Sequence, residues 1–269
     1  MSPEEPAAAM PSLRQRRRAV ARQEILGAAE QQIVEQGPHA LSLRAVARAL
    51  GMTVQALYHY FPSRDDLVTA LITKAYDDLA DAVQAAVDAV PEDVPEDSAT
   101  PRPVVAAEGY RRWAVAHPER FQLLYGAPLR SYRAPADGPT TQAVRRMTKV
   151  FQREMFVGFT LAQLAAADTR GLTASFRAHL ERLPQDGLGD LPPAAASLLL
   201  SAWGHMHGLV VLEVFGHTSF LGDHQGELFH TAMRDMVEGI HRRIPAAAPS
   251  GAAPPPASPP PPASPPPSA

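Results

Sequence analysis

Apolar residues recur at spacings of three and four along most of this chain, which is the pattern of one face of an α-helix. The first such face consists of Ile25, Leu26, Ala29 and Ile33 and predicts a helix over residues 19–36. A glycine and then a proline follow and end it, because the glycine favours a left-handed stop and the proline cannot continue a helix. No stretch of alternating residues predicts a strand. The expected fold class is therefore all-α.

Two shorter helices joined by a tight turn are predicted next. The pattern of residues 43–50 indicates a helix with Ser42 at its N-cap. Gly51 supplies the turn, and Thr53 is placed to cap a third helix, residues 54 to 60 or 61. The apolar residues of this third helix are expected to face the core. Its outer face then carries small and polar side chains, which suits a helix that enters a DNA groove.

A long helix and a helical body follow. Ser63 and Asp66 form a predicted capping box for a helix from about Arg64 to Ala89, whose apolar stripe indicates packing along its length. A loop rich in proline and acidic residues, 91–103, separates it from the rest. Further helices are predicted over residues 104–117, 118–125, 140–167, 172–183, 194–215 and 225–243. Residues 1–13 and the proline-rich tail 245–269 are expected to be disordered.

Charge is distributed unevenly. The formal net charge is -3, but residues 11–64 carry eight arginines and three glutamates, a local balance of +5. Five of these arginines lie between Arg14 and Arg22 with no acidic residue among them. Such a run is either a solvated tail or, directly before a helix pair that docks on DNA, an arm for the DNA backbone or minor groove. Arg17 and Arg18 are the candidate contacts in this arm.

The basic run, the glycine turn and the capped short helix together predict a helix-turn-helix; the alternative is a plain three-helix unit with surface tyrosines. The segment SLRAVARALGMTVQALYHYFPSRDDL closely resembles the DNA-binding domain of the tetracycline-repressor (TetR) family of bacterial transcriptional regulators, over about residues 22–71. The resemblance implies a DNA-contact set of Ser42, Arg44, Thr53, Val54, Gln55, Ala56, Tyr58, His59, Tyr60 and Arg64. Val54 and Ala56 offer no hydrogen bonds, so base readout would rest mainly on Gln55, which can pair bidentately with adenine, and on Arg44.

The C-terminal part resembles the WHG-type regulatory domain, a subgroup of TetR-type sensor domains, over roughly residues 100–243. The segments GYRRWAVAHPERFQLLYG and WGHMHGLVVLE carry this likeness, with Trp203, His207 and Gly208 as the signature. A small-molecule effector of unknown identity is expected to bind inside this body, beside Trp113, Phe121, Met147, Phe151, Met155, Trp203 and His207. Such side chains are also ordinary core residues, and a hydrogen-bonded core histidine is the alternative for His207.

The sequence gives little support for a metal site or an enzyme active site. The chain has no cysteine, which excludes disulfides and thiolate metal ligands. His205 and His207 are two residues apart and lie on different faces of a helix, so they cannot chelate one ion. The glycine-rich phosphate-binding motifs and the hydrolase serine motif are also missing. We therefore expect no catalytic residues, no metal and no cofactor.

One segment raises the question of a membrane. Residues 194–212 carry no Asp, Glu, Lys or Arg, and their length approaches the ~20 residues that span a bilayer. They contain histidines, glycines and serines and have no flanking basic belt, so a buried helix is the better interpretation. The N-terminus has no signal-peptide pattern. The expected location is the cytoplasm, with no membrane association.

These observations predict two domains, a helix-turn-helix domain with a basic arm over residues 14–64 and a helical ligand-binding and dimerisation domain over residues 65–244. The expected function is a repressor that binds a palindromic operator in double-stranded DNA as a homodimer, through residues 194–243, and is released by the effector. One alternative is a DNA-binding dimer without an effector. Another is a metabolite-binding all-α protein with a vestigial DNA-binding end.

Overall fold

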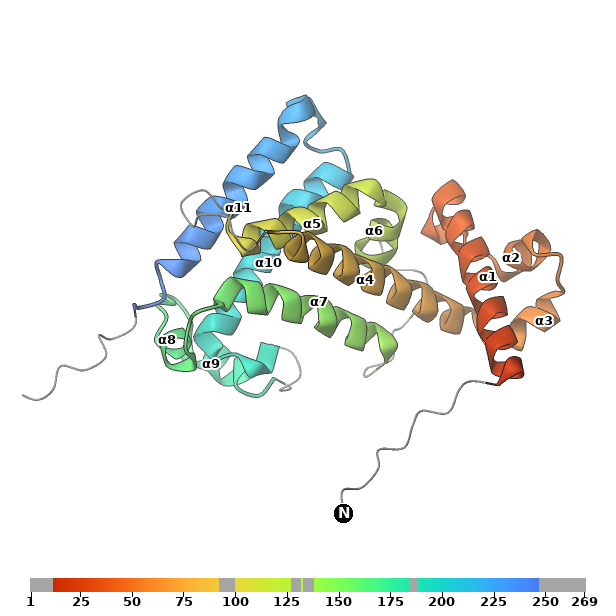
Figure 1. Ribbon diagram of the computed structural model, residues 1–269, viewed down its shortest axis with the longest axis horizontal. Coiled ribbons are helices and arrows are strands. Elements are labelled where there is room, and N and C mark those ends of the chain that lie inside the picture. The colour runs from red at the N-terminus through yellow and green to blue at the C-terminus, as the bar shows by residue number, and fades with distance from the viewer. Residues whose placement is uncertain (1–11, 92–99, 127–131, 133–137, 184–187, 247–269) are drawn as a thin grey trace, which may run out of the picture.

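The computed structural model describes residues 12–91, 100–126, 132, 138–183 and 188–246, and within these ranges every regular element is a helix (Figure 1). The elements are α1 (Leu13–Gln36), η1 (Pro38–Ala40), α2 (Leu43–Ala49), α3 (Val54–Tyr58), α4 (Arg64–Asp88), α5 (Arg102–Ala116), α6 (Pro118–Tyr125), α7 (Pro139–Phe156), α8 (Leu161–Ala165), α9 (Ala174–Leu180), η2 (Leu188–Asp190), α10 (Pro193–Val214), η3 (Ser219–His224) and α11 (Gln225–His241). The all-α prediction is confirmed. Most of the predicted disordered ends and most of the loop after α4 lie outside the described residues; Leu13, predicted to be disordered, belongs to α1.

The N-terminal helices α1, α2 and α3 form a small unit at one end of the molecule (Figure 1). Leu57 and Phe61 are fully buried in its core, as the pattern predicts, together with Ile25 of α1. Gly51 adopts a φ of 64° between α2 and α3, a left-handed conformation that favours glycine. Thr53 caps α3 by accepting the backbone N–H of Ala56 at 3.1 Å. The helix-turn-helix geometry therefore follows the sequence prediction closely.

The basic run is helical, which corrects the predicted start of the first helix. It forms the first turns of α1, which begins at Leu13 rather than near Ala19. Ser12 and Gln15 build a capping box, in which each side chain accepts the backbone N–H of the other, at 3.3 and 2.7 Å. Arginine, glutamine and alanine are good helix formers, so nothing in the run interrupts the helix.

Helix α4 belongs to two cores at once. Leu67 and Leu71 near its start pack in the core of the N-terminal unit, whereas Leu79 and Val83 further along pack in the larger core of the body. Figure 1 shows α4 running from the N-terminal unit into the body beside α5 and α7. Ser63 caps its first turn by accepting the Asp66 N–H at 3.0 Å. One continuous helix thus connects the two units.

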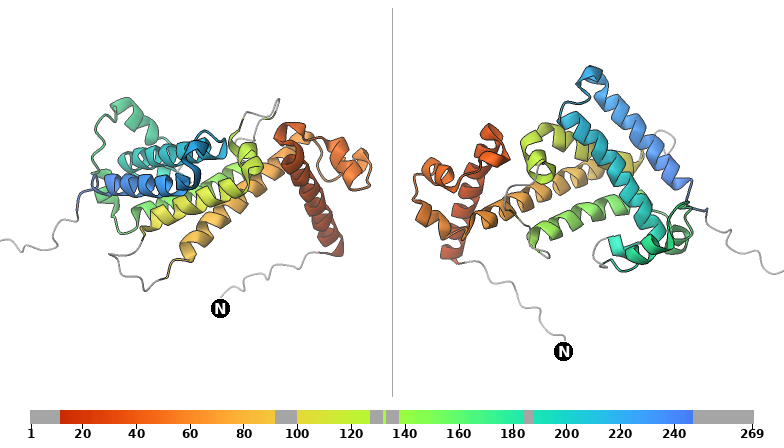
Figure 2. Two further views of the ribbon diagram at one scale, coloured as in Figure 1. Left: turned by 90° about the horizontal axis from the view of Figure 1, so that it is seen from above. Right: turned by 180° about the vertical axis from the view of Figure 1, so that it is seen from behind.

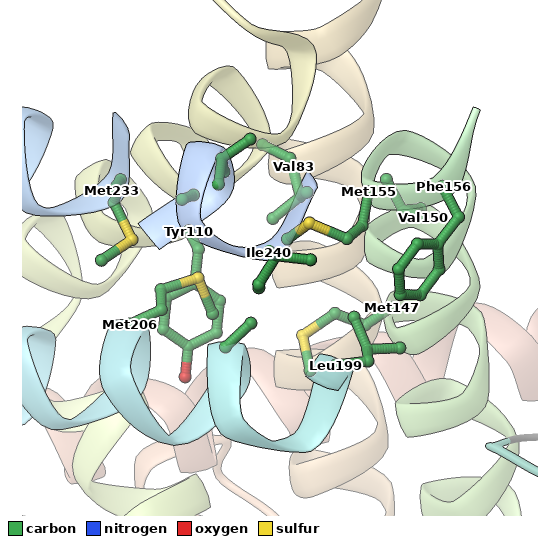
Figure 3. Close-up of a cluster of buried hydrophobic side chains, with 14 of the residues drawn as sticks. Val83, Tyr110, Met147, Val150, Met155, Phe156, Leu199, Met206, Met233 and Ile240 are labelled. Carbon is green, nitrogen blue, oxygen red and sulfur yellow. The ribbon is translucent and has the colours of Figure 1, made fainter. Parts of the chain in front are cut away.

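In the body, which comprises the described chain from α4 onward, α5 and α7 pack along α4, and α10 and α11 pack on α5 and on each other (Figure 2). Methionines are prominent in its core. Figure 3 shows Met147 and Met155 of α7, Met206 of α10 and Met233 of α11 in the same cluster as Tyr110 of α5.

Helix α7 is shorter than predicted. It ends at Phe156 instead of continuing to Ala167. Gly158 has a φ of 84°, which breaks the helical path. Thr160 and Gln163 then form a capping box that starts the separate helix α8. The apolar stripe continued across this break, so periodicity alone could not locate it.

Helix α10 is only partly buried in a single chain, although its apolar composition suggested burial all round. Within the described part of the chain it is the one helix whose length and composition match a membrane span, and 39% of its 18-residue apolar window is buried. It packs on α5, α8, α9 and α11. Gly204 and Leu212, which share one side of the helix, are exposed, Leu212 at 41%. The helix therefore has one face in the body and another that the described residues leave uncovered.

Candidate DNA-binding surface and ligand cavity

The outer surface of α2 and α3 presents most of the predicted DNA contacts. Arg44, Thr53, Gln55, Tyr58 and His59 are exposed there. The remaining members of the predicted set from this region, Ser42, Val54, Ala56, Tyr60 and Arg64, are half-buried. Gln55 is thus the polar side chain that projects from the middle of α3.

We expected Val54 and Tyr60 to point outward with the other side chains on the outer face of the third helix. Both are instead half-buried and pack against the core of the N-terminal unit. Each therefore presents only part of its side chain to a DNA groove. For Tyr60 the remaining polar groups still allow a contact with the DNA backbone.

Two arginines of α1 hold the C-terminal end of the α3 segment. Arg18 Nη2 donates to the carbonyl of His59 at 2.9 Å, and Arg22 Nη1 donates to the carbonyl of Tyr60 at 2.6 Å. The guanidinium of Arg22 also lies 4.2 Å from the centroid of the Phe61 ring. The last carbonyls of a helix lack intrahelical partners and carry partial negative charge, so cations stabilise them. Arg18 and Arg22 therefore fix the orientation of α3, and of the three arginines Arg17 and Arg18 are exposed.

A buried glutamine fixes the entry to α2. Gln32 is 8% exposed, and its amide donates to the carbonyl of Ala40 at 2.9 Å and accepts the N–H of Ser42 at 3.3 Å. Ser42 occupies the N-cap position, but its side chain makes no cap hydrogen bond. The predicted N-cap position of Ser42 is thus confirmed, but the predicted cap hydrogen bond from its side chain is not formed.

Ion pairs join the N-terminal unit to the body. Lys74 of α4 lies 3.0 Å from Glu30 of α1 and 2.8 Å from Asp78 of α4. Arg120 of α6 lies 3.1 Å from Asp78 and 3.7 Å from Glu30. These four side chains form one network across α1, α4 and α6. The acidic Glu30 is therefore paired inside the molecule and does not oppose the positive charge of the DNA-binding surface.

The body contains a cavity of about 420 Å³. Side chains from α4, α5, α6, α7, η2, α10 and α11 enclose it, and most are apolar. The lining consists of Tyr76, Pro103, Ala107, Tyr125, Val144, Arg145, Met147, Thr148, Phe151, Met155, Leu188, Leu199, Leu200, Ala202, Trp203, Met206 and Met236. A largely apolar cavity with a few polar groups is typical of a small-molecule site.

Four of the seven predicted ligand residues line this cavity: Met147, Phe151, Met155 and Trp203. The other three, Trp113, Phe121 and His207, do not belong to the lining. Phe121 is fully buried in the core, and Trp113 packs against His117 with 5.4 Å between the ring centroids. The lining tyrosines Tyr76 and Tyr125 were missed, because their positions on α4 and α6 look like ordinary core positions in the sequence.

His207 lies behind the cavity wall in a cluster of aromatic rings. Its Nδ1 is 2.9 Å from the hydroxyl of Tyr110, and its ring stacks on that of Trp203 with 5.0 Å between centroids. Its ring centroid is 4.5 Å from that of Tyr125. Burial lowers the pKa of His207, which favours the neutral imidazole. The alternative of a hydrogen-bonded core histidine therefore matches the geometry.

The tyrosines of this cluster remain protonated. Burial raises the pKa of Tyr125, and the neighbouring phenols of Tyr110 and Tyr76 raise it further. Burial likewise raises the pKa of Tyr110 and of Tyr76. The cavity wall thus offers neutral phenol groups. Among the described residues there is no group of three His, Asp or Glu side chains that could hold a metal ion.

Two family models match the chain. The model for bacterial regulatory proteins of the tetR family matches residues 25–71, and the model for a tetracyclin repressor-like C-terminal domain matches residues 104–236. The first match covers α3 with its supporting helices, and the second covers the cavity-bearing body up to α11. Neither match distinguishes the WHG subgroup, which stays a prediction.

Transcriptional regulators are also similar to this chain over most of its length. The HTH-type transcriptional regulator Rv1816 of Mycobacterium tuberculosis is 35% identical over 187 residues, which are 69% of this chain and 76% of that protein. The regulator Mb1846 of Mycobacterium bovis matches with the same identity and coverage.

Solved structures share the fold. A crystal structure of the protein SCO4313 has 32% identity and a TM-score of 0.65, over 84% of this chain and 100% of that chain. A protein from Rhodococcus sp. RHA1 has 23% identity and a TM-score of 0.56, over 81% and 94% of the two chains. The second likeness shows the fold alone.

Proposed function

The chain belongs to the TetR family of bacterial transcriptional regulators, and on that basis we propose that it is a repressor released from DNA by a small molecule. Two copies bind a palindromic operator in the cytoplasm, and the effector occupies the cavity of the body. The observation that supports this proposal is that α4 packs in both hydrophobic cores. Its N-terminal part packs in the core that supports α3, while Tyr76 further along lines the cavity.

The base-reading role falls to Gln55 and Arg44. Gln55 is exposed on α3, whose C-terminal end Arg18 and Arg22 hold in place. A glutamine amide can donate to and accept from an adenine edge at once. Tyr58, His59, Tyr60, Arg64 and the exposed Arg17 contact the phosphate backbone and set the position of the helix.

The dimer forms through α10 and α11. Leu212 and Phe215 are exposed on or directly after α10, and Leu228 is exposed on α11. Large apolar side chains gathered on neighbouring helices mark an interaction surface. At Gly204 and Gly208 nothing lies within 4 Å of the place that a Cβ would occupy. These glycines leave room for a helix of a second copy to approach α10.

The effector acts by preferring one arrangement of α4. A ligand shifts an equilibrium only as far as its affinities for the two states differ. Because α4 touches both the cavity and the core beneath α3, a ligand that favours one tilt of α4 changes the separation of the two recognition helices. The dimer then no longer matches half-sites that are ~34 Å apart, or a multiple of that distance.

Selection of genomic DNA fragments by the full-length protein tests this function. We expect enrichment of a palindrome, with binding that weakens steeply as salt concentration rises. On that palindrome, Gln55→Ala should relax the sequence preference by about 1–3 kcal/mol at one base pair in each half-site. Arg64→Ala should weaken binding to all sequences alike and reduce the salt slope by about one.

Gln142→Ala is the matched control, since it makes the same change at an exposed position of α7 within the body. It should leave both affinity and sequence preference unchanged. If Gln55→Ala preserved the full sequence preference, α3 would not be the reading helix. Enrichment of no common sequence would contradict the operator-binding function as a whole.

A further inference from the structure

The cavity is large enough for more than one ring. An apolar protein cavity of ~150 Å³ holds one benzene molecule, whereas this cavity measures about 420 Å³. Its volume therefore corresponds to a ligand of two or three linked or fused rings. The lining side chains are mostly aliphatic, aromatic or methionine, and methionine adapts its shape to the ligand that it contacts.

Charge in the cavity wall is sparse. No aspartate or glutamate belongs to the described lining, so an organic cation would find no carboxylate partner. The one charged lining residue is Arg145, which is half-buried and also borders the outer groove beside Lys149 and Arg153. Moving a charged ligand out of water is costly unless a hydrogen-bonded partner compensates. Since Arg145 already interacts with other residues, an anion would have to compete for it and a cation would find no partner, so the wall favours an uncharged ligand.

The polar groups best placed for recognition are the hydroxyls of Tyr76 and Tyr125, which also interact with each other. Thr148 also lines the cavity, but its hydroxyl donates to the carbonyl of Val144 at 3.0 Å within α7. Tyr76 and Tyr125 enter the cavity from α4 and α6, with their rings edge-to-face at a centroid distance of 5.8 Å. Tyr125 also neighbours Tyr110, and the hydroxyl of Tyr110 is paired with His207.

This cluster can present either polarity to a ligand. A phenol both donates and accepts a hydrogen bond, and a neutral imidazole has one donor and one acceptor nitrogen. If the Tyr110 hydroxyl donates to His207, the oxygens of Tyr125 and Tyr76 are available as acceptors. If His207 donates to Tyr110, the direction of the chain reverses, and the hydroxyl proton of Tyr76 at its end can turn toward the ligand. A ligand hydroxyl group is complementary to both arrangements.

We propose that the effector is an uncharged molecule of two or three rings that carries a hydroxyl group, and that this group binds Tyr76 and Tyr125. The inference rests on the proposed function, because it identifies the ligand class of the same cavity. A ligand bound in this way touches α4 and α6 together. Its hydroxyl group is then the part of the molecule that contacts the helix leading to the DNA-binding unit.

Calorimetric titration of the full-length protein tests this ligand class with four biphenyl probes of similar size. They are biphenyl-4-ol, 4-methylbiphenyl, biphenyl-4-carboxylate and 4-phenylbenzylammonium. We expect biphenyl-4-ol to bind more tightly than the carboxylate and the ammonium. Tyr76→Phe and Tyr125→Phe should each weaken biphenyl-4-ol about three- to tenfold, the effect of one lost hydrogen bond, and leave the affinity for 4-methylbiphenyl unchanged.

Tyr132→Phe is the matched control, because its hydroxyl lies 3.1 Å from the Thr69 hydroxyl and not in the cavity lining. It should alter the affinity for none of the probes. Tighter binding of either charged probe would overturn the proposal, and so would no binding of biphenyl-4-ol. The same holds if both phenylalanine variants bound biphenyl-4-ol as tightly as the unaltered protein. The titration contains no DNA, so a failure of the proposed repressor function in the DNA selection is a separate outcome.

Discussion

Replacing Arg22 with alanine removes two contacts that hold the C-terminal end of the α3 segment. The lost contacts are the 2.6 Å hydrogen bond to the Tyr60 carbonyl and the guanidinium placed 4.2 Å from the Phe61 centroid. A hydrogen bond of a charged group contributes about 1.5–3 kcal/mol, and a cation–π contact in an exposed site about 0.5–1 kcal/mol. Because Arg22 is half-buried, solvent screening places the sum near the lower limits. We expect a loss of about 2 kcal/mol in the local stability of the N-terminal unit.

Amide hydrogen exchange measures this loss where it occurs. Since every 1.4 kcal/mol is a factor of ten, protection of the peptides that cover α3 should fall about 30-fold, while the peptides of the body should not change. Arg17→Ala is the control, because it removes the same charge from an exposed position of α1. Both variants should weaken DNA binding, but only Arg22→Ala should reduce protection. If Arg22→Ala lowered DNA affinity and left the protection of α3 unchanged, Arg22 would be a DNA contact and not a structural support.

Two further predictions concern the dimer and pH. Leu212→Glu places a charge on the exposed face of α10 and should convert the dimer into a monomer in sedimentation velocity while the helical circular dichroism is retained; a persisting dimer would locate the interface elsewhere. Burial lowers the pKa of His207 and of His117, so below about pH 6.5 the unfolded chain binds more protons than the folded chain and stability falls as the pH falls. His207→Gln should reduce the slope of urea-unfolding free energy against pH in this window, and an unaltered slope would contradict the burial of a neutral imidazole.

Local patterns in the sequence predict the helix-turn-helix well, because its determinants are local. The apolar spacing identifies Leu57 and Phe61 as core residues, and both are fully buried. The glycine turn and the Thr53 cap are likewise signals within a few residues of the elements that they shape. Such signals need no knowledge of the tertiary fold.

Two element boundaries were missed although the signals are present. The motif of Ser12 followed by Gln15 starts α1, and the same kind of motif at Thr160 and Gln163 starts α8. The first cap was missed because the basic run was interpreted as an arm, and the second was missed because an apolar stripe continued across it. A capping box therefore deserves more weight than periodicity at such positions.

Long-range pairing could not be predicted from the sequence. Arg18 and Arg22 contact carbonyls that are 41 and 38 residues away, and no local pattern distinguishes these arginines from the exposed Arg17. The residues that line the cavity could not be predicted from local patterns either. Trp113 and Tyr125 are both aromatic residues on helical stripes, yet only Tyr125 reaches the cavity. The rotation of each helix about its axis decides between them, and packing of the whole body sets that rotation.

The position of the tyrosine pair relative to the ion-pair network shows how the two units can be coupled. Tyr76 lies two residues after Lys74 on α4, and Tyr125 lies five residues after Arg120 on α6. Lys74 and Arg120 both hold Glu30 of α1. A ligand that changes the spacing of α4 and α6 at the tyrosines therefore also changes the spacing of the two cations that bind α1. Since α1 also carries the arginines that hold the backbone carbonyls of His59 and Tyr60, the route from the cavity to the recognition helix runs along α4 and α6, through the Glu30 ion pairs, and along α1.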